Sequence, residues 1–397
     1  MLYKPEAFEQ LTDEPWREDR VRERIRAIVA DAEAAYSPDE FWPADEWDAW
    51  ECPLPLQNLY VGAAGVLWGL DALRRRGHEE GGLDLAAAAH RLVERWRMQP
   101  DFIESEEFTL PEPRESAFLA GGSGVMLIAW RLAPTDDVAD DLHARVLANK
   151  DNEADEVMWG SPGSMLAARA MHAWTGDERW ADAWRECADV LLARRDEDGI
   201  WPITLYGRTY PGLTPPHGAV GNVGSLLDGG QLLSNDVRET LRRETAALLA
   251  RTAVVENGFA SWPHPVGSGL ESEDGQIRLQ WCKGAPGVVI AAAPYLDEEL
   301  LLAGAELTWR AGPHGMEKGP GICHGTAGNG YAFLKTFART GDEQWLERAR
   351  RFAVHALEQV ERRGRGRYSL FTGDIGVALY AADCLDARSE YPITDTR

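Results

Sequence analysis

The 397-residue sequence has no long apolar run, and none of its hydrophobic stretches approaches the roughly 18–20 residues of a membrane-spanning helix. Its first residues have neither the basic start nor the apolar segment of a secretory signal peptide. No low-complexity linker divides the chain. We therefore expect a cytoplasmic protein with a single domain over residues 1–397, in which an N-terminal helix and loop (residues 1–57) pack on the remainder.

Basic residues are scarce. The chain has 41 lysines and arginines against 65 aspartates and glutamates, which gives a formal net charge of −24. Nucleic-acid binding depends on Lys and Arg that neutralise phosphates, so this balance argues against nucleic acid and equally against an anionic membrane surface. A basic or neutral peptide partner is compatible with the charge. The oligomeric state stays open, with a monomer as the simplest expectation.

Cysteines are also few. An odd number of five, far apart and without a secretory signal, does not indicate a disulfide framework. We interpret Cys52, Cys187 and Cys384 as small buried packing residues. Cys282 and Cys323 are set apart because each lies in a glycine-rich turn that recurs along the chain.

This turn is the dominant pattern of the sequence. A Gly-x-x-Gly pair followed by an apolar run occurs seven times, at Gly62/Gly65, Gly121/Gly124, Gly160/Gly163, Gly218/Gly221, Gly284/Gly287, Gly325/Gly328 and Gly373/Gly376. Segments that are apolar nearly all round predict buried helices. Glycine permits both positive φ angles and close approach of one backbone to another.

A more polar helix often follows the apolar one. The linkers at 175–180 and 340–345 match almost residue for residue, each beginning with Thr-Gly-Asp, and amphipathic stretches follow at 178–194 and 343–360. The repeat is therefore a helical hairpin with an inner and an outer helix. Seven such hairpins predict an all-α fold, a double-layered α/α toroid (barrel), with the glycine turns gathered at one end.

For the segments outside the repeat, composition indicates the secondary structure. Residues 17–36 predict one amphipathic helix, and residues 37–57 a loop rich in Trp and Pro. Residues 99–114 and 197–216 are expected to be loops, with short strands near 203–206.

Four side chains with ligand or proton-transfer chemistry lie in the late turns: His217, Cys282, Cys323 and His324. If the turns gather at one end of the ring, these side chains converge. Two thiolates and one imidazole suit Zn²⁺, and three protein ligands leave a tetrahedral position open, as in catalytic sites. Zinc lowers the pKa of a bound thiol from about 8.5, so the chemistry expected is thiol activation and addition to an electrophile.

The paired motifs resemble a known family. Trp281-Cys282-x-Gly284-x-Pro286-Gly287 together with Cys323-His324-Gly325-Thr326-Ala327-Gly328 is similar to the lanthionine synthetase C (LanC-like) family, closer to its eukaryotic-type, glutathione-binding branch. The resemblance implies a zinc-dependent toroid that adds a thiol to dehydroalanine or dehydrobutyrine in a peptide or protein. It also implies Cys282, Cys323 and His324 as the zinc ligands.

The resemblance extends to residues around the metal. His217 matches a histidine proposed to transfer the proton, Arg278 an arginine near the metal, and Lys318 a lysine of the glutathione-associated branch. Glu156 stands where peptide cyclases carry an aspartate, although Asp155 is an alternative.

Position 283 departs from the family pattern. Lys283 replaces a Tyr or His that is common there, and the added cation would contact a carboxylate or phosphate of the substrate. Arg278, Lys318 or Lys283 would stabilise the charge that develops on the amide oxygen of the acceptor.

Alternatives remain. A zinc- and glutathione-binding adaptor without catalysis would carry the same ligands. A prenyltransferase-like toroid is the less favoured alternative, since Asp136-Asp137-Val138-Ala139-Asp140 fits a D-D-x-x-D pattern but lies away from the glycine turns. Within the enzyme reading, the thiol comes either from glutathione, which is slightly favoured, or from a cysteine of the acceptor peptide.

Overall fold

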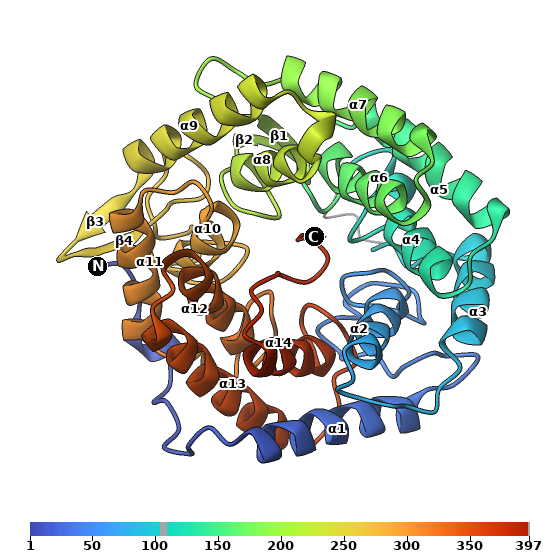
Figure 1. The fold of residues 1–397 in the computed structure, drawn as a ribbon, viewed down its shortest axis with the longest axis horizontal. Coiled ribbons are helices and arrows are strands. Elements are labelled where there is room, and N and C mark those ends of the chain that lie inside the picture. The colour runs from blue at the N-terminus through green and yellow to red at the C-terminus, as the bar shows by residue number, and fades with distance from the viewer. Residues whose placement is uncertain (104–108, 396–397) are drawn as a thin grey trace.

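The computed structural model describes residues 1–103 and 109–395, and it arranges their helices as two concentric rings (Figure 1). The inner ring consists of α2 (Ala63–Arg75), α4 (Gly122–Leu132), α6 (Ser161–Thr175), α8 (Ala219–Asp228), α10 (Ala285–Ala292), α12 (Thr326–Thr340) and α14 (Asp374–Asp386). The outer ring consists of α1 (Glu18–Ala35), α3 (Leu85–Met98), α5 (Asp136–Ala148), α7 (Glu178–Ala193), α9 (Asn235–Thr252), α11 (Glu298–Ala311) and α13 (Glu343–Arg363). The predicted α/α toroid is confirmed.

The seventh helix pair differs from the prediction. α14 is the last helix of the described chain, so no outer helix follows it, and α1 packs against it instead (Figure 1). The apolar face of α1, with Val21, Ile25 and Val29 buried, provides the contact surface. The fold therefore has six consecutive hairpins and a seventh pair built from the two ends of the chain.

The second glycine of each pair is required by close packing. A Cβ at Gly287 would overlap with the carbonyl oxygen of Trp281, and one at Gly328 with that of Ile322, six residues earlier in both cases. The other five pairs show the same relation. Positive φ, which the sequence also suggested, applies within the pairs to Gly284 (φ 90°), so backbone proximity is the general reason for the motif.

The two matching linkers form the same turn. α6 and α12 end at Thr175 and Thr340, and the following glycines adopt left-handed conformations with φ of 68° and 71°. The aspartates after them, Asp177 and Asp342, accept hydrogen bonds from backbone N–H groups at the start of α7 and α13. The local pattern thus fixes where each hairpin bends.

The remaining elements are short. Two antiparallel hairpins pair β1 (Pro202–Leu205) with β2 (Arg208–Pro211) and β3 (Val254–Glu256) with β4 (Phe259–Ser261), and the first confirms the expected strands. Single turns of 3₁₀ helix lie at η1 (Pro5–Ala7), η2 (Arg114–Ser116), η3 (Asn149–Asp151) and η4 (Gly230–Leu232). The segment 37–57 contains no helix or extended strand, as predicted, and part of the expected loop 99–114 lies outside the described residues.

The last described residues lie inside the ring. Residues 387–395 run from α14 into the centre of the toroid (Figure 1). None of the described helices combines the length and the apolar character needed to cross a membrane.

Candidate metal centre

Cys282, Cys323 and His324 come from two neighbouring turns of the inner ring. Cys282 precedes Gly284, the N-cap of α10, and the pair Cys323-His324 precedes Gly325, the N-cap of α12. α10 packs against α12, and the backbone N–H of Trp281 donates to the carbonyl of Cys323 at 3.1 Å. The turns are therefore joined directly at the ligands.

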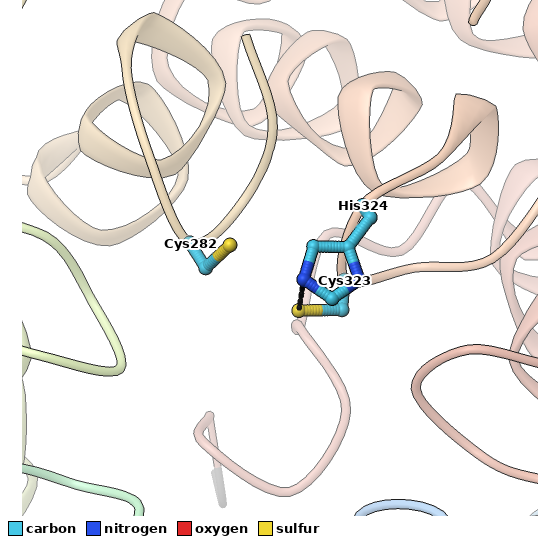
Figure 2. A group of neighbouring side chains, drawn as sticks. All are labelled: Cys282, Cys323 and His324. Carbon is cyan, nitrogen blue, oxygen red and sulfur yellow. Dashed lines mark hydrogen bonds between the residues drawn. The ribbon is translucent and has the colours of Figure 1, made fainter. Parts of the chain in front are cut away.

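The three ligand atoms face one another (Figure 2). They all lie within 4.8 Å of one another, and the Sγ of Cys323 is 3.4 Å from the Nε2 of His324. Cys323 is 2% exposed and Cys282 9% exposed. The structure thus brings together the three residues that the sequence singled out.

Ionisation of the two thiols is linked. The hydrogen bond from the Cys323 thiol holds the pKa of Cys282 well below its usual value, and His324 and the amide of Gln280, 2.8 Å away, act in the same direction. Burial and the neighbouring Cys282 raise the pKa of Cys323. One thiolate forms easily and the second needs a cation beside it, so the donor set fits a divalent soft metal such as Zn²⁺.

Two aromatic residues from distant segments touch the ligands. Tyr60, beside the first glycine turn, forms a side-chain hydrogen bond with Cys323, and burial followed by the charge of Cys323 raises its pKa well above the usual value. Trp47, from the N-terminal loop, lies edge-on to His324 with ring centroids 5.6 Å apart. Neither residue was predictable from the sequence, because neither position carries a metal-binding motif.

The C-terminal segment supports the same turns from inside the ring. The ring of Tyr391 stacks on Trp281 at 5.0 Å, and its hydroxyl donates to the carbonyl of Ile322 at 2.7 Å. Tyr391 therefore contacts the residue before each ligand-bearing cysteine, and it fixes the spacing between the two turns.

His217 pairs with Glu156. Its Nδ1 lies 2.6 Å from Oε2 of Glu156, a fully buried carboxylate that also accepts the backbone N–H of Trp159 at 2.5 Å. Asp155, the alternative, forms an ion pair with Arg194 at 3.0 Å. A carboxylate partner places the proton of the neutral ring on Nδ1, which leaves Nε2 available to a substrate.

A second histidine lies beside the first. His264 is 6.4 Å from His217 between ring centroids, and its Nδ1 accepts the backbone N–H of Leu213 at 3.3 Å. Burial, then the charges of His217 and Lys283, lower the pKa of His264 to about 3, while Cys282 opposes this shift. His264 is thus a neutral imidazole with its proton on Nε2. No motif surrounds it in the sequence, where it had no assigned role.

The predicted cations are less closely engaged. Arg278 forms an ion pair with Asp274, with one contact of 3.1 Å. Lys283 is half-buried, and burial followed by the charge of Arg278 lowers its pKa. Lys318 is exposed. No hydrogen bond or ion pair joins these three described side chains to Cys282, Cys323 or His324, although Lys283 adjoins Cys282 in the chain and its charge interacts with that thiol.

The sequence model for "Lanthionine synthetase C-like protein" matches residues 18–394, nearly the whole chain. The chain belongs to this family. It is 26% identical over 308 residues to the zebrafish (Danio rerio) "Glutathione S-transferase LANCL1", covering 69% of this chain and 73% of the relative. It is 34% identical over 113 residues to the Arabidopsis thaliana "LanC-like protein GCL1", covering 25% of each chain.

A solved structure shares the fold. "Nisin cyclase" aligns with a TM-score of 0.58 at 14% identity and covers 84% of this chain and 89% of its own. At this identity the likeness concerns the arrangement of helices alone. It agrees with the double ring of Figure 1.

A cavity of about 940 Å³ lies next to two residues that contact the candidate metal ligands of this LanC-like chain. Its walls include Tyr60 and Trp47, which contact the ligands, and also His217. The cavity is therefore bordered by His217 and by two aromatic side chains that contact Cys323 and His324. The volume is at the upper end of the range for small-molecule sites.

The other cysteines and the aspartate-rich segment lie elsewhere. Cys187 is fully buried, which raises its pKa to about 12, and Cys384 is also fully buried. Cys52 is half-buried and borders the cavity. Asp137 and Asp140 lie on the outer helix α5 and form ion pairs with Arg97 and Arg179, so this segment is not a diphosphate site at the glycine turns.

Proposed function

We propose that this protein forms thioethers by adding a thiol to dehydroalanine or dehydrobutyrine in a peptide or protein, with zinc as its cofactor. The observation that carries the proposal is the meeting of two thiols and one imidazole from separate turns within 4.8 Å. Membership of the LanC-like family supports it. A reducing compartment such as the cytoplasm suits a chain in which Cys187, Cys282, Cys323 and Cys384 form no disulfide.

Cys282, Cys323 and His324 would hold the metal, and a zinc ion there supplies a Lewis acid that keeps a substrate thiol in its nucleophilic thiolate form. Three ligands from the chain leave room for that thiol. The hydrogen bonds from Gln280 to Cys282 and between Tyr60 and Cys323 hold the ligand sulfurs in position.

The remaining steps use the chain's own residues. The thiol sulfur forms a bond to the β carbon of the acceptor, and the electrons of the double bond move towards the amide oxygen. The Nε2–H of His264 is the group we assign to stabilise that oxygen. His217 takes up the thiol proton and returns it to the α carbon, while Glu156 holds the ring in one orientation and stabilises its protonated form.

Glutathione is the thiol we propose. The zebrafish relative is named a glutathione S-transferase, and Lys283 and Lys318 provide cations for the carboxylates of such a thiol. An acceptor peptide that supplies its own cysteine is the alternative, since nisin cyclase, by its name, closes rings.

Mass spectrometry separates these possibilities. Purified, zinc-loaded protein is incubated with a dehydroalanine peptide and glutathione, and with a peptide that carries both dehydroalanine and cysteine. Addition of glutathione raises the mass by one glutathione, whereas cyclisation removes a free thiol without a mass change. If fully zinc-loaded protein forms neither product, it is an adaptor and not an enzyme.

The ligand assignment has its own control. Cys323→Ala and Cys282→Ala are expected to abolish zinc binding and activity while the helical fold survives. Cys187→Ala is the matched variant, because this cysteine is buried away from the turns. Full zinc occupancy in either ligand variant would remove the site assignment.

A further inference from the structure

The walls of the 940 Å³ cavity are acidic as well as aromatic. Four carboxylates border it, Asp45, Glu46, Asp48 and Asp101, against one arginine, Arg365. This composition differs from that of the turns that carry Cys282 and Cys323, where the nearby charged side chains include Lys283, Arg278 and Lys318. The two sides of the site therefore suit substrates of opposite charge.

Ion pairs neutralise only half of these carboxylates. Arg365 lies 2.7 Å from Asp45, and the Nε of Arg367 lies 2.7 Å from Asp48. Glu46 is exposed, and no ion pair joins it to another described residue. Glu46 and Asp101 thus leave the cavity negative after pairing.

Asp101 is the more informative of the two. It is 3% exposed, and its Oδ2 accepts hydrogen bonds from the backbone N–H groups of Gln57 and Asn58 at 2.6 and 3.1 Å. Its Oδ1 is buried and has no hydrogen-bond partner among the described residues. A buried carboxylate oxygen without a partner is costly, and a cation or N–H group from a bound molecule would satisfy it.

Aromatic side chains complete the walls. Trp47 and Trp50 are 60% and 47% exposed, which is unusual for such large side chains, and Phe102 and Trp159 lie on the same cavity. Aromatic faces attract cations, as the guanidinium of Arg367 over Trp47 at 5.3 Å illustrates. Acidic groups and exposed indoles together favour a cationic side chain on an extended peptide.

We propose that this cavity binds the acceptor peptide and selects one with a lysine or arginine next to the dehydro residue, while the anionic thiol approaches from the side of Lys283. The identity of the bound segment as an acceptor rests on the proposed function, but the charge preference does not. The overall charge of −24 draws such a peptide towards the protein in solution.

Binding of unreactive analogues tests the preference without catalysis. Three peptides carry alanine in place of dehydroalanine and differ in the flanking residue, which is Lys, Leu or Glu. We expect the Lys peptide to bind the zinc-loaded protein about fivefold more tightly than the Leu peptide, and the Glu peptide to bind most weakly, as for a partly screened ion pair. The difference should shrink in 0.5 M salt.

Variants locate the effect. Glu46→Gln and Asp101→Asn remove one charge each, and Asn retains an acceptor oxygen for the backbone of Gln57 and Asn58, so both should lower the Lys-over-Leu ratio with unchanged zinc content. Glu347→Gln, on the exposed side of the outer helix α13, is the matched control and should leave the ratio unchanged. Equal binding of the three peptides, tighter binding of the Glu peptide, or an unaltered ratio in both variants would overturn the inference.

The two proposals fail in different ways. Selective binding of the Lys peptide without any adduct from its dehydroalanine counterpart would reject the catalytic function and keep the cavity assignment. Adducts that form at equal kcat/KM on all three dehydroalanine peptides, together with unselective binding, would reject the cavity assignment and keep the function.

Discussion

The two histidines of the site, His217 and His264, differ in the hydrogen bonds that they form. His217 and His264 lie 6.4 Å apart, yet the first faces a buried carboxylate and the second a backbone N–H. The carboxylate at Nδ1 of His217 leaves Nε2 as a hydrogen-bond acceptor, whereas burial lowers the pKa of His264 to about 3 and the N–H donor at its Nδ1 leaves the proton of that neutral ring on Nε2. The two imidazoles therefore suit different tasks, proton transfer for His217 and hydrogen-bond donation for His264.

Two amide substitutions test His264. In His264→Asn, the side-chain oxygen can accept the N–H of Leu213 but the distal donor is lost, and we expect kcat to fall about 10²-fold, as when one oxyanion donor is removed. His264→Gln places an N–H near the position of Nε2 and should retain more of the rate. Zinc content stays unchanged in both. Wild-type turnover in the Asn variant would assign His264 a structural role only.

Neighbouring carboxylates offer a matched pair for His217. Glu156→Gln keeps one acceptor oxygen, which can serve the N–H of Trp159, but it replaces with an amide the oxygen that pairs with His217 and accepts the N–H of Met158, so we expect about a 10²-fold loss of kcat with zinc retained. Asp155→Asn changes a carboxylate that pairs with Arg194, and it should leave turnover near wild type. Similar losses in both variants, measured on folded protein, would contradict a specific role for Glu156.

At the scale of elements, the inner-helix turns carry the cluster of Cys282, Cys323 and His324, and side chains from irregular segments contact these turns. The convergence of Cys282, Cys323 and His324 was predictable because the same glycine turn precedes every inner helix, so equivalent positions lie at one end of the ring. Tyr60, Trp47 and Tyr391 were not predictable as neighbours of the ligands. They come from a turn, a loop and the C-terminal segment, respectively. The positions of these segments depend on tertiary packing, and their sequences have no periodic pattern that would predict it.

The C-terminal segment provides the prediction at this scale. Tyr391→Ala removes the stacking on Trp281 and the hydrogen bond to Ile322, and we expect zinc affinity to fall about tenfold, as for loss of a residue that orients ligands. Tyr391→Phe keeps the stacking and should lose less zinc affinity. Competition with a chelator measures the zinc affinity of both variants. Equal affinity in wild type and the Ala variant would show that the segment does not support the site.

The whole molecule is a ring closed by its ends. The amphipathic helix at residues 18–35 was predicted correctly, but its place in the outer ring was not. Its partner helix, α14, lies more than 300 residues away in the sequence. Hydrophobic periodicity shows that one face of a helix is buried, but it does not show which other helix covers that face. Six helix pairs are predictable from the sequence because a short linker joins the two helices of each pair. The seventh pair, α1 and α14, forms only when the ring closes.

Closure should therefore depend on the buried face of α1. Ile25 is fully buried between the rings, and Ile25→Ala is expected to cost about 2–4 kcal/mol of unfolding free energy through the lost contacts and the cavity left behind. Arg22→Ala, on the exposed face of the same helix, should change it little. Denaturant titration of both variants measures their free energies of unfolding. If the two variants unfold alike, α1 is an appendage to the ring and does not close it.

Ring closure also sets an order of events during synthesis. Cys282 and Cys323 leave the ribosome before α14, whose pairing with α1 completes the ring, and before Tyr391, which joins the two ligand turns. The backbone N–H of Cys323 donates to Phe371, which is also made later. A nascent chain can thus display both cysteines and still lack a finished metal site. If the site binds zinc as proposed, its capture would be one of the last steps in the maturation of the protein, and stalled or shortened chains would be left with two thiols that no metal holds.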